Sequence, residues 1–385
     1  DLRSSSNYGF AVKTPFHWAI DESQDLTITP FVTSEEGVLG ELEYRRAFEN
    51  GSLSLAGSIS SDDRPGGEGG VRGHLDTDGR FFLGPRGEWG WDVKVASDDA
   101  YLDFFDFSNE DRLTSELYAE RYGPRWYVDA RGFRFQSLRD DEPAGQIPLA
   151  LPVVDARYEL AEEMFSGTLG AFAASQGLVR NNGTDTGRVT LGVEWRREEV
   201  LPVGLALTGF AEVRGDLFFK GDDKAPGAPD GVEARLAPLA GVRARYPLVA
   251  GEPGGATHVL EPVVQGIVAP FGGNGPEFPN EDSLITEFDE TNLFDRSRFS
   301  GYDGFEEGPR LDLGLSYERI AVSGLRFDAA VGRSLRLREA DEFSEGSGLA
   351  DAVSDWVGSW SASYDPYVTV RQRLRIEDDG EVTRN

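Results

Sequence analysis

The sequence predicts an all-β protein, an antiparallel transmembrane β-barrel of the outer-membrane type, and three observations support this prediction. Apolar and polar residues alternate with a period of two in many stretches bounded by Gly, Pro, Asn or Asp, which is typical of strands with two different faces. No run approaches the roughly 18 apolar residues of a membrane helix. Aromatic residues gather near the ends of alternating stretches, as interfacial girdles do; they are Trp89, Trp91, Tyr101, Trp126, Tyr127 and Trp195.

The alternation is clearest in three segments, 52–60, 310–317 and 368–376. In a soluble sandwich the polar residues would face water and the apolar residues a core. In a membrane barrel the apolar residues face lipid and the polar residues a wet lumen. Alternation alone does not separate these two folds. The aromatic positions and the 47 glycines, which suit tightly turned and closely packed strands, favour the barrel.

The connections divide into short turns and long polar segments rich in Gly and Pro, and barrels place their long loops outside. With strands of about 10 residues, the chain supplies on the order of 15 to 18 strands. Residues 282–294 are acidic and short, and we interpret them as loop rather than helix. The expected long loops are Ser61–Gly70, Asp140–Gly145, Lys220–Gly231, Gly251–Ala256, Gly272–Gly308 and Glu339–Asp355.

The charge balance argues against nucleic acid as a partner. The net charge is -30, from 38 basic and 68 acidic side chains, whereas phosphates are met by clustered Lys and Arg. The acids form solvated loop surface, or alternatively a rim that holds divalent cations beside anionic lipid heads. Cysteine is absent, so the chain contains neither a disulfide nor a Cys-based metal site.

Nothing in the sequence indicates an enzyme, a cofactor or a metal centre. The three histidines, His17, His74 and His258, are far apart and lie outside any metal-ligand or nucleophile pattern. Acidic pairs occur in turns, where adjacent carboxylates are more often solvated than catalytic; they are Asp98 and Asp99, Asp140 and Asp141, Asp222 and Asp223, and Asp378 and Asp379.

One segment, Asn292–Gly308, has an unusual order of residues, NLFDRSRFSGYDGFEEG. Its distinctive members are Asn292, Leu293, Phe294, Arg298, Phe299, Gly301, Tyr302, Asp303, Glu306 and Gly308. This segment resembles a motif of LptD, the lipopolysaccharide-assembly outer-membrane protein family, in which it precedes a clean strand. The opening segment also resembles the family's first two barrel strands, with Tyr8, Gly9, Pro15–Trp18 and Asp25–Pro30. Further matches in the family's order are Glu43–Arg46, Gly51, Arg72–His74, Leu149–Pro152 and Val331–Ser334.

The resemblance covers residues 1–385 as a single barrel domain and implies that the chain is part of a 26-stranded barrel. The resemblance covers only the family's barrel portion, so the N-terminal jelly-roll is expected to be missing here. The last barrel strands are expected to be missing too, because the chain ends in the polar residues GEVTRN and an open sheet edge cannot be left in lipid. The implied location is the outer membrane of a Gram-negative cell.

The resemblance also implies a function and partners. The expected function is a translocon that assembles lipopolysaccharide into the outer leaflet, through the barrel lumen and a lateral gate between the first and last strands. The expected partners are lipopolysaccharide, a lipoprotein plug of the LptE type, periplasmic lipopolysaccharide-bridge proteins that act through the jelly-roll, and outer-membrane lipids. Two alternatives stay open: a general porin or substrate-specific channel, and an acidic secreted β-protein that binds sugars or cations.

Pro15 and Pro30 are the candidate gate residues, because the resemblance places one in each of the first two strands. Proline gives no N–H to the ladder, and in the family such prolines weaken the seam between first and last strands. The alternative is that both prolines merely end strands.

Arg371, Arg373 and Arg375 place three cations on one face of the predicted strand 368–376, with Arg336 and Arg338 nearby in sequence. They are possible luminal cations. Either they pair with luminal Asp and Glu, or they contact lipid phosphates or a plug protein, and the sequence does not choose.

Overall fold

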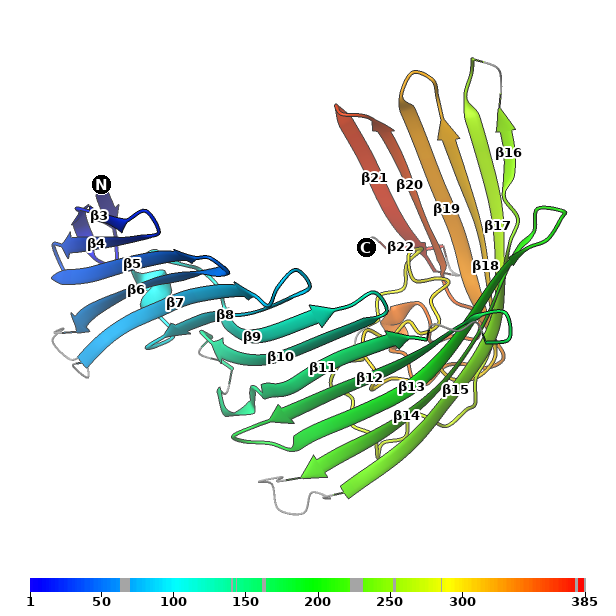
Figure 1. Cartoon of the computed structure of the whole chain (residues 1–385), viewed down its shortest axis with the longest axis horizontal. Helices are drawn as coiled ribbons and strands as arrows, with labels where there is room; N and C mark the ends of the chain where they lie inside the picture. The colour runs from blue at the N-terminus through cyan, green and yellow to red at the C-terminus, as the bar shows by residue number, and fades with distance from the viewer. Residues whose placement is uncertain are drawn as a thin grey trace. The chain divides into compact units, whose positions relative to one another are not determined.

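The computed structural model describes residues 1–385 except 63–69, 140, 143, 161–163, 222–230, 252–253, 285, 378–379 and 384–385. The regular secondary structure of the described chain is almost entirely strand (Figure 1), and every registered pairing in it is antiparallel. The predicted all-β class is confirmed. No helix in the described residues is long and apolar enough to cross a bilayer.

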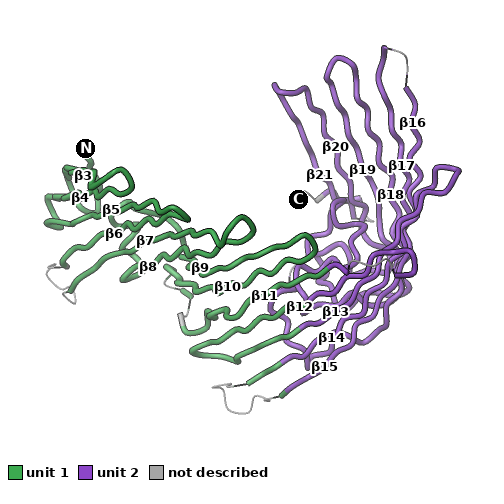
Figure 2. Tube along the Cα trace, viewed as in Figure 1, with its two compact units in different colours: residues 1–158, 173–189, 219–231 green, residues 159–172, 190–218, 232–385 purple. Residues whose placement is uncertain are grey.

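The chain divides into two compact units (Figure 2). Unit 1 comprises Asp1–Tyr158, Ala173–Val189 and Phe219–Gly231, and unit 2 comprises Glu159–Phe172, Thr190–Phe218 and Val232–Asn385. Strands β12 (Thr168–Val179), β13 (Asp185–Val200) and β14 (Ala206–Gly221) contribute residues to both units.

In unit 1, each strand from β4 to β11 pairs with the next strand of the chain. β1 pairs with β2, and both β2 and β3 pair with β4. The bounds are β1 Leu2–Ser5, β2 Gly9–Lys13, β3 Phe16–Asp21, β4 Gln24–Thr33, β5 Val38–Phe48, β6 Gly51–Asp62, β7 Gly70–Phe82, β8 Gly87–Ala96, β9 Arg112–Tyr122, β10 Trp126–Ser137 and β11 Leu149–Glu159.

In unit 2, β15 and β16 both pair with β17, and the pairing continues strand by strand from β17 to β22. The bounds are β15 Gly231–Arg245, β16 Leu248–Gly251, β17 Thr257–Val268, β18 Arg310–Ile320, β19 Leu325–Arg336, β20 Trp356–Tyr364, β21 Val368–Ile376 and β22 Val382–Thr383. Short 3-10 turns lie at Ala144–Gln146 and Glu345–Ser347.

The three segments of clearest alternation are strands, as predicted: they correspond to β6, β18 and β21. The described residues of 282–294 form turns and irregular structure, which confirms the loop interpretation. The expected connection from Gly251 to Ala256 lies between β16 and β17. Its residues 252–253, like 63–69 and 222–230 of other expected loops, lie outside the described chain.

Tyr101 was expected to belong to an aromatic girdle at the membrane interface, and the structure shows that this expectation is wrong. It lies in the helix α1 (Tyr101–Phe104), and its side chain is fully buried. The aromatic spacing was misleading here because the segment between β8 and β9 folds back onto the sheet. Its aromatic side chains then pack into a core instead of facing a membrane interface.

In β18 the apolar face is exposed and the polar face is covered, which is the reverse of a strand in a soluble sandwich. Leu311 and Leu315, on the apolar face, are 39% and 42% exposed, whereas Arg310 and Asp312, on the polar face, are 5% and 0% exposed. An exposed apolar row beside a covered polar row is the pattern of a strand in a membrane barrel wall, where lipid contacts the apolar side.

We predict that Leu315→Arg, tested in the complete protein, destabilises the barrel by about 2–4 kcal/mol, because the arginine would face lipid near the middle of a strand. Ser316→Arg is the matched control on the polar face and should cost much less. The urea midpoint of unfolding in lipid vesicles measures both variants. Equal destabilisation by the two variants would contradict this assignment of the faces.

Candidate functional site

The long connection between β17 and β18, residues 269–309, folds onto the polar face of unit 2 and is drawn in yellow in Figure 1. We call it the clamped loop. The motif Asn292–Gly308 is its second half. Polar side chains from β14, β15, β17, β18 and β19 reach it; they are Arg214, Arg235, Gln265, Asp312, Ser334 and Arg336.

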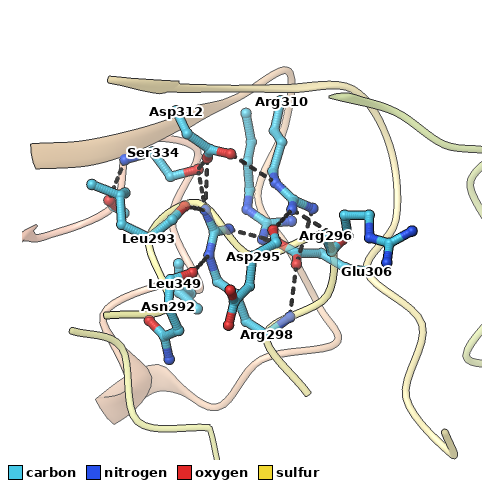
Figure 3. Close-up of polar contacts among 12 residues, drawn as sticks. Asn292, Leu293, Asp295, Arg296, Arg298, Glu306, Arg310, Asp312, Ser334 and Leu349 are labelled. Carbon is cyan, nitrogen blue, oxygen red and sulfur yellow. Dashed lines mark hydrogen bonds and ion pairs between the residues drawn. The ribbon is translucent and has the colours of Figure 1, made fainter. Parts of the chain in front are cut away.

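Arg298 lies at the centre of these contacts, and its side chain is fully buried (Figure 3). Its Nη1 donates to Glu306 Oε1 at 2.6 Å, and its Nη2 lies 2.6 Å from Asp312 Oδ1 on β18. Nη2 also donates to the backbone carbonyl of Leu293 at 2.7 Å. One guanidinium therefore joins two segments of the loop to the strand wall through charge-assisted hydrogen bonds.

The acids beside Arg298 are paired with further arginines. Glu306 forms ion pairs with Arg310, at 2.9 Å, and with Arg336 on β19. Arg336 also lies 3.3 Å from Glu342, which belongs to the loop between β19 and β20. Three arginines thus face the three carboxylates of Glu306, Asp312 and Glu342, and this balance is what lets so many charges stay buried.

The pKa values of two loop carboxyls follow from this arrangement. Burial alone would raise the pKa of Glu306, but Arg298, Arg310 and Arg336 hold it below its ordinary value of 4.5. Burial raises the pKa of Glu342 above that value. Glu306 is therefore the carboxylate whose ionised form the loop stabilises.

A second set of contacts holds the middle of the motif. Arg235 on β15 donates to the backbone carbonyls of Tyr302 at 2.6 Å and of Asp303 at 2.7 Å. Its charge is balanced by Asp216 on β14, at 2.7 Å, and Asp216 also accepts a 2.8 Å hydrogen bond from Thr190. Backbone of the loop is thereby bonded directly to the wall.

The loop is also tied to itself through two acids. Asp282 accepts hydrogen bonds from the backbone N–H groups of Tyr302 at 3.2 Å and Asp303 at 3.0 Å. Asp303 in turn accepts from the N–H groups of Glu281 at 2.7 Å and Asp282 at 3.1 Å. A Cβ at Gly301 would overlap the Asp282 carboxyl, which explains the glycine in the motif.

The remaining motif residues are structural. Leu293 and Phe299 belong to a buried apolar cluster with Phe288, Ala340, Phe343, Leu349 and Val357, and Phe294 packs against it. Phe299 stacks on Phe343 at 4.8 Å. Asn292 donates to the Glu287 carbonyl at 2.6 Å, and Gly308 has a φ of +75° beside Phe271. The distinctive motif residues therefore either fix the loop on the wall or stabilise the loop itself.

The prolines of the predicted gate lie one residue out of register with each other. The register runs unchanged from Lys13↔Phe31 on β2 to Phe16↔Ile28 on β3, so Thr14 faces Pro30 across the ladder. The N–H of Thr14 donates to the Pro30 carbonyl at 3.1 Å. Pro30, which lies inside β4 rather than at its end, has no N–H to return the second bond of that pair.

Pro15 has a different orientation from Pro30. Adjacent residues of a strand direct their backbone groups to opposite neighbours. Lys13 bonds toward β1, where its N–H donates to the Asp1 carbonyl at 2.9 Å, and Thr14 bonds toward β4, so Pro15 faces away from β4. In the described residues β3 pairs with β4 alone. Pro15 lies between β2 and β3 rather than inside a strand, and it lacks a donor on the side away from β4. Pro30 removes a donor from the ladder between β4 and the β2–β3 segment.

The arginines of β21 lie on the polar face. Arg373 is 3.2 Å from Glu290 and 3.6 Å from Asp289 of the clamped loop, and Arg375 is 3.3 Å from Asp355. Arg371 and Arg373 also line an open cavity of about 720 Å³ on the polar face, together with Glu261, Glu318, Asp328 and Trp360. Of the two nearby arginines, Arg336 is part of the buried network and Arg338 lies 3.6 Å from Glu307.

Unit 1 has a loop on its polar face too, which the sequence analysis did not anticipate. Residues 97–111, between β8 and β9, pack against the sheet through Tyr101 and Phe105. The Tyr101 and Ser58 hydroxyls are 2.7 Å apart, and Tyr8 donates to Asp106 at 2.7 Å. The density of aromatics between residues 101 and 107 was the signal available in the sequence.

In the described residues, no group of three or more His, Asp or Glu side chains is placed to hold a metal ion. The polar face instead offers paired charges, hydroxyls and aromatic rings. This arrangement can anchor a loop and can contact a polar ligand in the open cavity.

Comparison with known proteins gives a consistent result. A family model described as LPS transport system D, LptD, matches residues 70–382. The LPS-assembly protein LptD of Nitrosococcus oceani is 28% identical over 340 residues, which cover 81% of this chain and 43% of that protein. Those of Idiomarina loihiensis and Nitrosomonas eutropha are 24% and 25% identical, over 99% and 98% of this chain and 51% and 54% of theirs. The chain spans about half the length of these curated relatives.

A solved structure, the beta domain of the Bordetella autotransporter BrkA, aligns with 91% of this chain and 96% of its own. The TM-score is 0.23 and the sequence identity 11%. A likeness at that score supports no conclusion about this chain.

We predict that Arg298→Met frees the clamped loop, because it leaves Glu306 and Asp312 buried with fewer partners, a change that costs about 3–5 kcal/mol for a buried ion pair. Chymotrypsin, which cleaves after aromatic residues such as Phe299 and Tyr302, should cut the folded variant within the loop. Arg326→Ala removes an exposed arginine of β19 whose ion pairs are with Glu318 and Asp328, outside the loop, and is the control. Resistance of Arg298→Met equal to that of the control would show that the network does not hold the loop.

We also predict that acid releases the loop. The pKa of Glu306 is depressed in the folded state, so its contribution to stability is complete above about 4.5 and is lost as the pH falls through the lower folded-state value. Hydrogen exchange of residues 298–308, corrected for the intrinsic effect of pH, should accelerate only below about pH 4.5. Glu306→Gln should remove this step. A step that persists in Glu306→Gln would assign it to another group.

Proposed function

Because the chain belongs to the LptD family, we propose that it forms part of the translocon wall that assembles lipopolysaccharide into the outer leaflet of the Gram-negative outer membrane. The observation that carries this proposal is the family match over residues 70–382, together with the motif Asn292–Gly308 folded onto the polar face as a clamped loop. The family acts in transport and assembly, and the proposed role involves no catalysis.

The two faces of the wall fit the needs of such a substrate. Lipopolysaccharide is an amphiphile with a large anionic sugar head, so its transfer requires a polar path beside an apolar surface. In unit 2 the exposed leucines of β18 offer the apolar surface, and the cavity of about 720 Å³ offers hydroxyls and charges on the other side of the same strands. A lipoprotein plug of the LptE type and periplasmic bridge proteins would be the further partners.

We propose that Pro15 is the residue of the pair that weakens the lateral gate. Its backbone nitrogen points to the outer edge of β3, where a closing strand of the complete barrel would pair. A proline there withholds one ladder hydrogen bond, worth roughly 0.5–1.5 kcal/mol, from that closing seam. Pro30 weakens the pairing of β2 and β3 with β4, so it acts on the flexibility of the first strands rather than on the closing seam.

We propose that Arg371 contacts the polar part of the transported lipid, since it lines the open cavity. Arg373 and Arg375 are held by Glu290 and Asp355, and we assign them to fixing the loops on the wall. This division follows from charge pairing, because an arginine already paired with a carboxylate has less to offer a phosphate.

We predict that Pro15→Ala reduces delivery of lipopolysaccharide to the cell surface, because the restored N–H strengthens the closing seam of the complete barrel. Pro30→Ala should have the smaller effect, and Pro85→Ala, in the turn between β7 and β8, is the control. Surface lipopolysaccharide and its crosslinking to the complete protein measure the outcome. Unchanged delivery in the double variant Pro15→Ala, Pro30→Ala would refute the gate assignment.

A further inference from the structure

A second pair of prolines repeats the geometry of Pro15 and Pro30 in the other unit. β15 and β16 pair with β17 in one continuous register, from Arg245↔Val263 before the interruption to Leu248↔Leu260 after it. Tyr246 and Pro247 form the interruption, and Tyr246 therefore faces Pro262. The spacing of fifteen residues between Pro247 and Pro262 is the same as between Pro15 and Pro30.

The hydrogen bonds at the two interruptions also correspond. The N–H of Tyr246 donates to the Pro262 carbonyl at 3.1 Å, as that of Thr14 does to Pro30. Pro262 has no N–H with which to return the bond to the Tyr246 carbonyl. At this point the ladder of β15, β16 and β17 keeps one hydrogen bond of a pair that normally has two.

Pro247 in turn faces away from β17, because Tyr246 before it bonds toward β17. In the described residues β16 pairs with β17 alone. The segment beyond the interruption is thus held on one side only, by a ladder that has lost a donor at its base. Prolines at the start of an edge strand also protect it from pairing with a foreign strand.

We infer that Pro247 and Pro262 form a second weak seam, at which β16 moves as a hinge relative to β15 and β17. Side-chain contacts across the seam are few: Arg245 lies 3.7 Å from Glu261, with Arg245 47% exposed. Such an exposed pair contributes little to holding the strands together. The neighbouring Leu248 and Leu260 are 45% and 37% exposed and add little packing.

The hinge lies at one wall of the open cavity. Val259 and Glu261, close to Pro262 on β17, line the cavity. Their register partners on β18, Glu318 and Ser316, line it as well. The other side of the cavity includes Glu290 and Thr291 of the clamped loop, which the buried arginine network fixes. Motion of β16 at the seam therefore takes place next to one wall of the cavity.

The test is hydrogen exchange of the complete protein in lipid nanodiscs without lipopolysaccharide, so that it is independent of the proposed function. In the natural protein, the amides of Leu248 and Leu260 should exchange faster than those at the middle of β18. Pro262→Ala restores one ladder donor and should slow them by roughly two- to tenfold, the effect of one net hydrogen bond. Pro30→Ala, the corresponding change at the other proline pair, should leave them unaltered.

Two further measurements keep the test decisive. Pro262→Gly restores the donor with a smaller side chain and should also slow exchange; it serves if Pro262→Ala does not assemble. Amides of Leu248 and Leu260 that are already as protected as the middle of β18 in the natural protein would overturn the inference. So would equal slowing by Pro262→Ala and Pro30→Ala, which would point to a general effect on the barrel.

Discussion

The structure depends on the pairing of buried charges on one face of a wall whose other face is apolar. A strand such as β18 presents exposed leucines on one side, and its buried charges, Arg310 and Asp312, lie on the other. An unpaired charge there would carry the full cost of leaving water. Arg298 forms ion pairs with Glu306 and Asp312, and Arg310 and Arg336 form further ion pairs with Glu306. The loop and the wall neutralise one another.

This constraint explains why the motif has so fixed an order. Arg298 and Glu306 must reach the wall charges, Gly301 must leave room for Asp282, and Tyr302 and Asp303 must present their carbonyls to Arg235. Phe299 and Leu293 fill the apolar space beside the network. In unit 1 a loop also covers the polar face, but there aromatic packing around Tyr101 replaces the charges. The loops are thus part of each unit's core rather than free surface.

The all-β class and the strands β6, β18 and β21 could be predicted because the alternation of apolar and polar residues is a local pattern. It can be recognised without knowing which distant residues a strand contacts. The motif residues could be found as a pattern, but their partners could not. Arg235 and Asp216 look like any polar residues of alternating strands until the fold places them under Tyr302. Tyr101 was misassigned because an aromatic near a strand end can face a membrane interface or a covering loop. The correspondence of Pro247 and Pro262 with Pro15 and Pro30 emerged only from the register, since spacing alone does not show which residue lies opposite a proline.

The most direct test of this account is a double-mutant cycle between Arg298 and Asp312 in the complete, membrane-embedded protein. Arg298→Met, Asp312→Leu and the double variant would be compared by the rate at which chymotrypsin cuts the clamped loop. If the two side chains stabilise one another, the double variant is cut much more slowly than the product of the single effects requires, because neither charge is left buried alone. Effects that simply multiply would contradict the claim that mutual charge pairing holds the loop on the wall.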